Sequence, residues 1–447
     1  MENIMYFIKP SFLIVLCLAA FFNASSATVA EKAPAAAVES NTRYYVSETG
    51  HDANNGLSQE KPFRSIQRAA DLTKPGDIVY IMNGTYTKDE PTGNILTITR
   101  SGKDNAFITY QALPGQTPKL KSKNWNAIKV EGASYISIDG LEIEGNSDNI
   151  KIEYALVQKD NRNNPATSGN GILICEKGGQ NPHHITISNC KIYKCCGGGI
   201  ASKHADYLTI EDNIVYENAL YSPYGNSGIS TYQNWNSDSN TGCKIIIRRN
   251  ISRHNQNLVP FFAAGGITDG NGIIVDDLQN TQGSSKLGAY KGRTLIENNV
   301  VYCNGGRGIH VFHSDNVDIV NNTVYQNSQN PKIPEGEISV LWGSEIKVFN
   351  NIMYASKDKP ANSVNEAKGT VFDYNLVFNG NFTGPVAHNV IDKNPLFTDE
   401  AKFDFTLQKK SPAVNAGTSE LRVTRDMLNL QRPQGSAVDI GAYERKQ

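Results

Sequence analysis

The 447-residue chain lacks an excess of charge of either sign: its 43 Lys and Arg residues stand against 44 Asp and Glu residues, and its net charge is −1. A protein that binds nucleic acid through the phosphate backbone presents a basic surface, so this balance argues against that class of function. An anionic ligand would have to meet positive charge that is placed locally.

Cysteine is scarce as well, with seven residues, of which Cys17 lies in the N-terminal segment. The other six are Cys175, Cys190, Cys195, Cys196, Cys243 and Cys303. None of them forms a zinc-ligand spacing with a partner pair. One or two disulfides are possible in an exported protein, with Cys195 and Cys196 as candidates, but burial as small apolar residues is an equally good interpretation.

Long hydrophobic runs are absent too, because the run at residues 12–22 is too short to span a bilayer. Lys9 precedes this run and Ser25-Ser26-Ala27 follow it, which is the pattern of a secretory signal over residues 1–27. The composition of the next stretch predicts a flexible leader over residues 28–42. We therefore expect a bacterial protein that is secreted, periplasmic or held at the cell surface, without a membrane span.

Helical periodicity is nearly absent, and no helical heptads follow residue 75. The exception is residues 62–72, where apolar residues recur at helical spacing between Pro62 and Pro75-Gly76. Residues 43–47 and 77–82 read as short strands on either side of this helix. Because the first rung of a parallel stack has an open edge, we expect the helix to cover it.

What the sequence has instead is one strand repeated six times. The repeats begin at Gly171-Ile172, Gly199-Ile200, Gly228-Ile229, Gly272-Ile273, Gly308-Ile309 and Glu337-Ile338. A second column carries Asn at a turn position and ends in Tyr, and its copies at Asn299 and Asn322 lie 23 residues apart. A period of this length indicates a solenoid with one coil per repeat, whereas β-propeller blades need about 40 residues.

The repeats predict an all-β, right-handed parallel β-helix with an N-terminal capping helix. We expect a single domain over residues 43–447, with a C-terminal cap over about 380–447. Asn at the turn position suits left-handed backbone geometry and can hydrogen-bond to the equivalent residue one coil away. The Ile residues should stack inward as a ladder.

The same register predicts which side chains face outward, because side chains alternate along a strand. Lys203, Tyr232, Asp276 and His310 should lie on four successive rungs of one face, and rungs are about 4.8 Å apart. Two rungs next to Asp276 carry about 14 and 26 residues more than one coil. Such insertions form loops on one face, often the binding face, and they include Trp235.

Asp269, Asn271, Asp276 and Asp277 cluster on and around one of these rungs. Oxygen donors without Cys or His suit calcium rather than zinc. The spacing is not that of an EF-hand, and a solvated acidic turn is an equally good interpretation. Because adjacent residues on a strand face opposite ways, Asp277 could be a turn residue instead of a ligand.

A base facing an acidic metal site suggests the removal of a proton α to a uronate carboxylate, followed by loss of the 4-linked sugar. His310 fits the base, since a neutral imidazole is available near pH 7. Lys203 or Lys286 would serve only if burial and nearby charge lowered the pKa. Arg307 would pair with a substrate carboxylate, although His310 and Arg307 would also be unexceptional as surface residues.

Nearly the whole chain after the leader resembles the β-helical polysaccharide lyases, most closely the family that contains exopolygalacturonate and rhamnogalacturonan lyases. The likeness rests on the Gly-Ile coils and on Tyr44-Tyr45-Val46-Ser47, Lys61-Pro62-Phe63, Lys74-Pro75-Gly76-Asp77 and Gly84-Thr85-Tyr86. It implies an acidic calcium cluster on one rung and a lysine base on the next, two positions after a Gly. His310 stands at that lysine position, and Asn271 and Ile274 stand at two of the aspartate positions.

These observations predict a monomeric lyase that cleaves a galacturonate-containing pectin by calcium-assisted β-elimination. Rhamnogalacturonan is favoured over homogalacturonan, because near-neutral charge suits a polymer whose carboxylates are diluted by neutral sugars. A glycoside hydrolase using Asp276 with Asp238 or Asp269 is a second possibility. A non-catalytic glycan-binding protein with Tyr232, Trp235 and Phe312 as sugar platforms is a third. The expected partner of the lyase is an acidic plant polysaccharide.

Overall fold

The computed structural model describes residues 41–90, 92–123 and 125–446. The predicted signal sequence at 1–27, and nearly all of the predicted leader at 28–42, lie outside these residues. Within them, no helix is long and apolar enough to cross a membrane. Ser40–Gln447 form one unit that consists of stacked coils.

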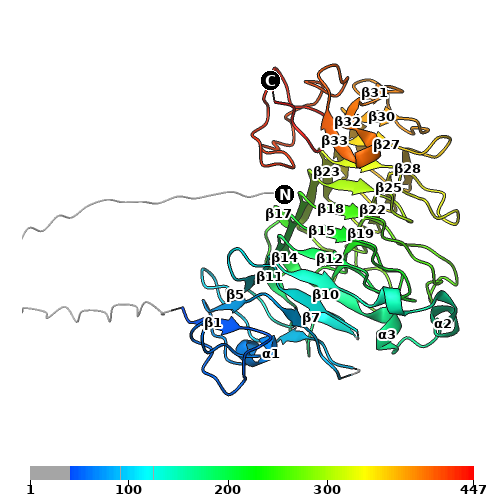
Figure 1. The fold of residues 1–447 in the computed structure, drawn as a ribbon. Coiled ribbons are helices and arrows are strands. Elements are labelled where there is room, and N and C mark those ends of the chain that lie inside the picture. The colour runs from blue at the N-terminus through cyan, green and yellow to red at the C-terminus, as the bar shows by residue number, and fades with distance from the viewer. Residues whose placement is uncertain (1–40, 91, 124, 447) are drawn as a thin grey trace, which may run out of the picture. The chain divides into compact units, whose positions relative to one another are not determined.

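Each full coil contributes one strand to each of three parallel sheets, so strands three apart in the chain are neighbours (Figure 1). The β1 sheet contains β1 (Arg43–Val46), β2 (Ile78–Ile81), β5 (Ile108–Ala112), β8 (Ile136–Asp139), β11 (His183–Ser188), β14 (Asp206–Glu211), β17 (Cys243–Arg248), β20 (Arg293–Glu297), β23 (Val317–Val320), β26 (Lys347–Phe349) and β29 (Val371–Asp373). The β3 sheet contains β3 (Thr85–Tyr86), β6 (Lys119–Lys121), β9 (Glu142–Glu144), β12 (Lys191–Tyr193), β15 (Ile214–Tyr216), β18 (Ile251–Arg253), β21 (Val300–Tyr302), β24 (Thr323–Tyr325), β27 (Ile352–Tyr354), β30 (Leu376–Phe378) and β31 (Val390–Ile391).

The third sheet, called here the β4 sheet, carries the repeated Gly-Ile strands. It contains β4 (Leu96–Ile98), β7 (Asn126–Glu131), β10 (Asn170–Cys175), β13 (Ile200–Lys203), β16 (Ile229–Tyr232), β19 (Ile273–Asp276), β22 (Ile309–Phe312), β25 (Ile338–Leu341) and β28 (Asn362–Asn365). The chain is thus a right-handed parallel β-helix, as the repeats predict.

The Ile ladder inside the β4 sheet is confirmed. Ile172, Ile200, Ile229, Ile273, Ile309 and Ile338 pair one with the next along the stack, and each is fully buried. One apolar residue repeated on each rung fills the interior, so the hydrophobic stabilisation is distributed along the whole stack.

The Asn column forms a hydrogen-bonded ladder at a turn. In each repeat the backbone N–H and Nδ2 of one Asn donate to Oδ1 of the next, as from Asn250 to Asn299 and from Asn299 to Asn322. The residue just before the ladder Asn has a positive φ, for example 52° at Asn298. A second ladder, through Asn255, Asn304 and Asn327, ends on the buried carboxyl group of Glu337 and was not predicted.

The capping helix α1 (Ile66–Ala70) lies where it was expected but is shorter than residues 62–72. Ser65 ends the extended segment that precedes it and accepts a hydrogen bond from the N–H of Arg68. Phe63 forms a parallel bridge with Val46, which keeps the chain extended up to that point. The helix contacts β1, β2 and β4 and buries Ile66, Ala69 and Ala70 at the first rungs.

The remaining helical turns are short. The loop before β10 holds η1 (Ser147–Asn149), α2 (Ile152–Val157) and α3 (Pro165–Ser168), and η2 (Glu400–Lys402) joins the antiparallel strands β32 (Phe397–Asp399) and β33 (Asp404–Leu407). The C-terminal segment packs against the outer face of the β3 sheet. There Phe397, Phe405 and Ile440 form a second apolar cluster with Tyr302 and Tyr325.

Candidate functional site

The candidate site lies on the outer face of the β4 sheet. One outward column runs through Lys203, Tyr232, Asp276 and Phe312, and the next runs through Ala201, Ser230, Ile274, His310 and Ser339. The predicted residues therefore share a face, but His310 is paired with Ile274 and not with Asp276. Strand alternation turns both residues outward, but they occupy different columns because His310 stands two positions after its Gly and Asp276 stands four.

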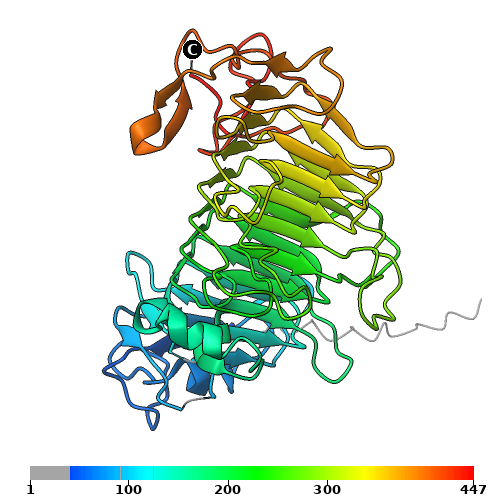
Figure 2. The ribbon, with the colours of Figure 1, turned by 90° about the vertical axis from the view of Figure 1, so that its right-hand side faces the viewer.

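Inserted loops border this face at both ends of its strands. Residues 217–228 and 254–272 precede β16 and β19, and residues 233–242 and 277–292 follow them. Figure 2 shows loops extending from both sides of the stacked strands. The insertions predicted from the coil period fall in these four loops.

Asp277 is a turn residue that anchors the loop at 277–292. It is fully buried, has a φ of 51° and accepts hydrogen bonds from Gln233 Nε2 and Gln282 N, and from both the N–H and the hydroxyl of Thr281. A carboxylate has about four lone-pair sites. The side chain is therefore fully engaged in holding the loop.

Asp276 and Asp269 approach the face from opposite ends of the same rung. Burial, the nearby carboxyl group of Asp269 and that of Asp277 raise the pKa of Asp276 to about 8, against the opposing effect of a 3.0 Å hydrogen bond from Gln282. Burial likewise raises the pKa of Asp269, whose oxygens accept bonds from Thr268 and Asn271. Two carboxyl groups that disfavour each other's ionisation attract protons or a cation.

Asn271 and Arg307 form the wall beside Asp269. Asn271 is fully buried, donates to Asp269 Oδ1 at 2.9 Å and accepts the backbone N–H of Arg307 at 2.9 Å. The guanidinium of Arg307 donates to the carbonyl oxygen of Thr268 and pairs with Glu335 at 2.8 Å. Arg307 is thus positioned by the loop that carries Asp269, and it is partly neutralised.

His310 is almost fully buried, with 3% of its surface exposed. Burial, followed by the nearby positive charge of Arg307, holds its pKa well below the ordinary value of 6.5. Its Nδ1 lies 3.3 Å from the carbonyl oxygen of Ser339, which can only accept, so we assign the proton to Nδ1. The lone pair on Nε2 is then available to take a proton.

Of the other predicted residues, some lie on the outer face of the β4 sheet and others lie away from it. The ammonium group of Lys203 lies 5.6 Å from the ring centre of Tyr232. Burial and the nearby charges of Asp276 and Asp277 raise the pKa of Tyr232 to about 12, so it remains a neutral hydroxyl. Lys286 is exposed in the loop after β19. Trp235 turns away from the face, because its Nε1 donates to Pro182 O and its ring lies against His183, the first residue of β11 in the β1 sheet.

Asp238, the alternative partner of Asp276, belongs to a separate cluster. Hydrogen bonds from Tyr207 and Lys244 lower its pKa to about 2. The ammonium of Lys244 is also paired with the buried Asp206 at 2.6 Å. Asp238 is thus an ionised carboxylate that stabilises its own loop, and Asp269 is the better candidate partner for Asp276.

The oxygen donors expected for calcium are only partly available. Asp277 accepts four hydrogen bonds within the fold and Asn271 is held between Asp269 and Arg307. Asp269 and Asp276 accept two bonds and one bond, which leaves lone pairs on both. Over the described part of the chain, no group of three or more His, Cys, Asp or Glu side chains is placed to hold a metal. Calcium takes about six to eight oxygens, so substrate and water would have to complete a two-carboxylate site.

Two residues next to the site were not predicted from the sequence. Gln282 donates both to Asp276 and to Asp277, and Glu335 pairs with Arg307. Gln282 lies in an insertion that the coil period did reveal. Glu335 lies in the turn before β25, and its pairing depends on a loop conformation that no repeat specifies.

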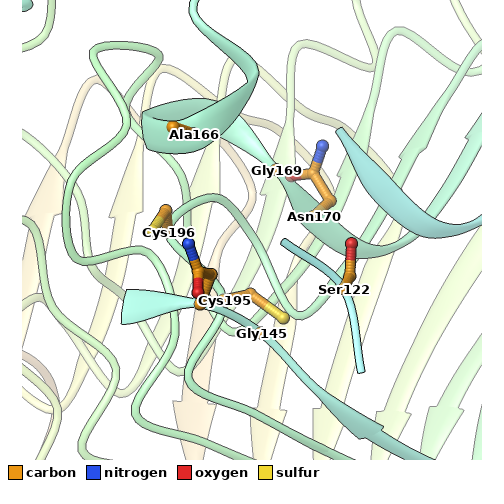
Figure 3. Close-up of a pocket in the computed structure, with 8 residues that line it drawn as sticks. Ser122, Gly145, Ala166, Gly169, Asn170, Cys195 and Cys196 are labelled. Carbon is orange, nitrogen blue, oxygen red and sulfur yellow. The ribbon is translucent and has the colours of Figure 1, made fainter. Parts of the chain in front are cut away.

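A small pocket farther down the stack is lined by Ser122, Asn146, Asn170, Cys195 and Cys196, among others (Figure 3). Its volume of about 10 Å³ leaves room for about one water molecule. Burial raises the pKa of the Cys196 thiol to about 12 and that of Cys195 still further, so both stay protonated. All six cysteines of the described chain are free thiols.

Fold and site together define a parallel β-helix protein with an acidic, loop-bordered face. The family model described as "Pel9A-like, right handed beta helix region" matches residues 44–337, and the chain belongs to this family.

Two curated relatives span most of the chain. Pectate lyase L of Dickeya dadantii (strain 3937) is 24% identical over 96% of this chain and 97% of its own length. The uncharacterized protein YwoF of Bacillus subtilis (strain 168) is 24% identical over 83% of this chain and 91% of its own length.

Two solved structures are similar to the chain, and the first of them shares its fold. Pectate lyase Pel9A has a TM-score of 0.54 at 19% identity, covering 91% of this chain and 97% of that structure. A rhamnogalacturonan lyase has a TM-score of 0.49 at 15% identity, covering 75% of this chain and 87% of that structure.

Proposed function

We propose that the protein is a polysaccharide lyase that cleaves a galacturonate-containing polymer by β-elimination. Membership of the Pel9A-like family and the end-to-end likeness to pectate lyase L support the class. The same likeness favours homogalacturonan as the substrate. The near-neutral charge of the chain had instead favoured rhamnogalacturonan. The observation that carries the proposal is the buried, neutral His310 on the face that also bears Asp276 and Asp269.

In this proposal His310 Nε2 removes the proton on the carbon next to the uronate carboxylate. The electron pair of that C–H bond forms a double bond to the adjacent carbon, whose bond to the glycosidic oxygen breaks. The departing sugar oxygen takes up a proton, with the neutral hydroxyl of Tyr232 as its source, on the rung next to Asp276 and two rungs from His310. Arg307 pairs with a substrate carboxylate, and its ion pair with Glu335 holds it in place.

We also propose that Asp269 and Asp276 hold a calcium ion together with the substrate carboxylate. When bound, calcium would neutralise the negative charge that grows on that carboxylate as the proton leaves. Asp277 and Asn271 then act indirectly, by fixing the loops that carry the two ligands. Lys203 and Lys286 are exposed, whereas a lysine base needs burial, so the proposal assigns the proton transfer to His310.

The test is to incubate the protein with polygalacturonate and, separately, with rhamnogalacturonan, with calcium or with chelator, and to follow the ultraviolet absorbance of unsaturated uronate. We expect absorbance to rise fastest on polygalacturonate and to disappear with chelator. New reducing ends without absorbance would replace the proposal by hydrolysis through Asp269 and Asp276. Binding without either signal would favour a glycan-binding protein.

The base is tested by His310→Ala, which should lower kcat on the order of 100-fold or more. His313→Ala is the matched control, because His313 lies just beyond the same strand but stacks on Trp342. Since the pKa of His310 is held well below 6.5, wild-type kcat/KM measured at saturating calcium, so that protons do not displace calcium from Asp276, should stay high as the pH falls to 6.5 and should be lost only below it. Full activity in His310→Ala would show that another residue is the base.

A further inference from the structure

Three loops meet at one edge of the β4 sheet, beside Asp269. They are residues 145–169, 217–228 and 254–272, which precede β10, β16 and β19. The hydroxyl of Tyr224 donates to the carbonyl oxygen of Arg162 at 2.8 Å, and the N–H of Phe262 donates to that of Pro223 at 3.0 Å. The three loops are therefore tied to one another.

The side chains at this junction form what we call the Phe262 patch: Arg162, Tyr224, Phe261 and Phe262. Phe262 meets Tyr224 and Phe261 edge to face, at ring-centre distances of 5.6 and 5.2 Å. Tyr224 and Phe262 remain 40% and 42% exposed. Large aromatic surfaces left open beside one another on a loop junction are suited to binding a ligand.

Arg162 gives the patch a charge. Its guanidinium lies 4.8 Å from the ring centre of Phe262, while its side chain is exposed. No acidic side chain in the described part of the chain forms an ion pair with it within 4.0 Å. A guanidinium that is held on an aromatic ring and has no carboxylate partner is well placed to bind one.

The patch adjoins the candidate site directly. Gly225 follows Tyr224 and has a φ of 63°. A Cβ atom on Gly225 would lie 2.8 Å from Asp269 Oδ2 and 3.2 Å from the ring of Phe261. The Asp269 carboxylate and the ring of Phe261 thus both lie beside the same glycine, and a chain bound at Asp269 can continue onto the patch.

We propose that the Phe262 patch is a subsite for a further uronic acid unit of the polymer. The exposed rings of Tyr224 and Phe262 pack against the apolar face of the sugar, and Arg162 pairs with its carboxylate. This assignment rests on the proposed function, because it assumes that a uronate polymer occupies the site. It adds that longer substrates bind better than short ones and that these three loops determine this preference.

The experiment measures binding of a galacturonate hexamer and a galacturonate dimer by titration calorimetry, with His310→Ala as the background so that the ligand is not cleaved. Arg162→Gln and Tyr224→Ala should each raise the Kd for the hexamer about tenfold and leave the Kd for the dimer unchanged. Arg64→Gln, which alters an exposed arginine at the first coils, is the control. Melting temperatures of all variants report whether the loops remain folded.

Equal hexamer affinities in the background protein and in both patch variants would overturn the subsite. Failure of the proposed function has a different signature, because the wild-type protein would then yield no unsaturated uronate from any polymer. Phe262→Leu, which keeps an apolar side chain but removes the ring, should weaken hexamer binding as well. If it binds as tightly as the background protein, the aromatic surface does not contact sugar.

Discussion

Asp276 and Asp277 are adjacent in the chain but have opposite surroundings. Asp276 is the last outward residue of β19, accepts one hydrogen bond and has a pKa of about 8. Asp277 lies in the turn and accepts four hydrogen bonds. The backbone changes from strand at Asp276 to a left-handed turn at Asp277. This change makes Asp276 a candidate calcium ligand and Asp277 an anchor of the loop at 277–292.

Glu337 is a third acidic residue whose role comes from its surroundings. It ends the ladder of Asn255, Asn304 and Asn327, and burial raises its pKa to about 8 although Asn327 donates to it. The folded protein therefore keeps the Glu337 proton up to about pH 8, whereas the unfolded chain releases it near pH 4.5.

We predict that Glu337→Gln reduces the pH dependence of stability. Between about pH 4.5 and 8, folding takes up a proton at Glu337, so the free energy of unfolding of the wild-type protein falls as the pH rises, by about 1.4 kcal/mol per pH unit in this window. The amide cannot ionise, so the free energy of unfolding of the variant should rise relative to that of the wild-type protein between pH 5 and pH 8. Urea unfolding at both pH values measures this, with the exposed Glu366→Gln as control. Parallel pH slopes would contradict it.

The site could be predicted from sequence only as far as strand alternation reaches. Tyr232, Asp276 and His310 were placed on one face because period and register are properties of the repeat. The proton position on His310 depends on a carbonyl group one coil later, and the orientation of Trp235 depends on a hydrogen bond to Pro182. Such contacts join segments that share no sequence pattern, so the sequence does not predict which of the possible contacts form.

At the scale of elements, the repeated strands and the first Asn ladder were predictable, because one residue type recurs at one position of each coil. The length of α1 was not, since Phe63 follows the helical pattern but bridges to Val46 of β1 as extended chain. The second Asn ladder was missed because its members lie after the recognised repeat, where the loops vary in length.

We predict that Asn299→Ala destabilises the fold more than any single surface change. Asn299 is fully buried; its Nδ2 donates to Ile247 O and its Oδ1 accepts two hydrogen bonds from Asn250. Each buried polar group that loses its partner costs about 1–3 kcal/mol, so the free energy of unfolding should fall by about 3 kcal/mol or more. Asn163→Ala, at an exposed position, is the control for urea unfolding. A loss below about 1 kcal/mol would mean that water or a neighbouring side chain replaces the amide.

At the scale of the whole molecule, the Tyr that ends each copy of the second column contacts side chains that the repeat does not predict. Tyr193 and Tyr216 stack on each other near Lys191 and Arg253. From Tyr302 onward, the same column is covered by Phe397, Phe405 and the rest of the C-terminal segment. A solenoid leaves its outer faces open, and here the end of the chain closes part of one.

One buried ion pair holds this C-terminal segment in place. Arg432 Nη1 pairs with Glu444 at 2.8 Å and Arg432 Nη2 donates to Asn298 Oδ1 at 3.1 Å, at the turn before β21. The two charged side chains are 0% and 1% exposed. Removing one partner of such a pair leaves an uncompensated buried charge and costs about 3–5 kcal/mol.

Arg432→Met should therefore release the C-terminal segment while the coils stay folded. The expected result is faster proteolysis after residue 391, together with dye binding to the uncovered Tyr302 and Tyr325, and a far-ultraviolet spectrum that keeps its β content. The double variant Arg432→Met/Glu444→Gln removes both charges and should regain much of the protease resistance, because no buried charge is left unpaired. Equal protease resistance in the wild-type protein and the single variant would show that apolar packing alone holds the C-terminal segment. If the double variant releases the segment as completely as the single variant does, the hydrogen bonds of Arg432, rather than its charge, fix the chain end.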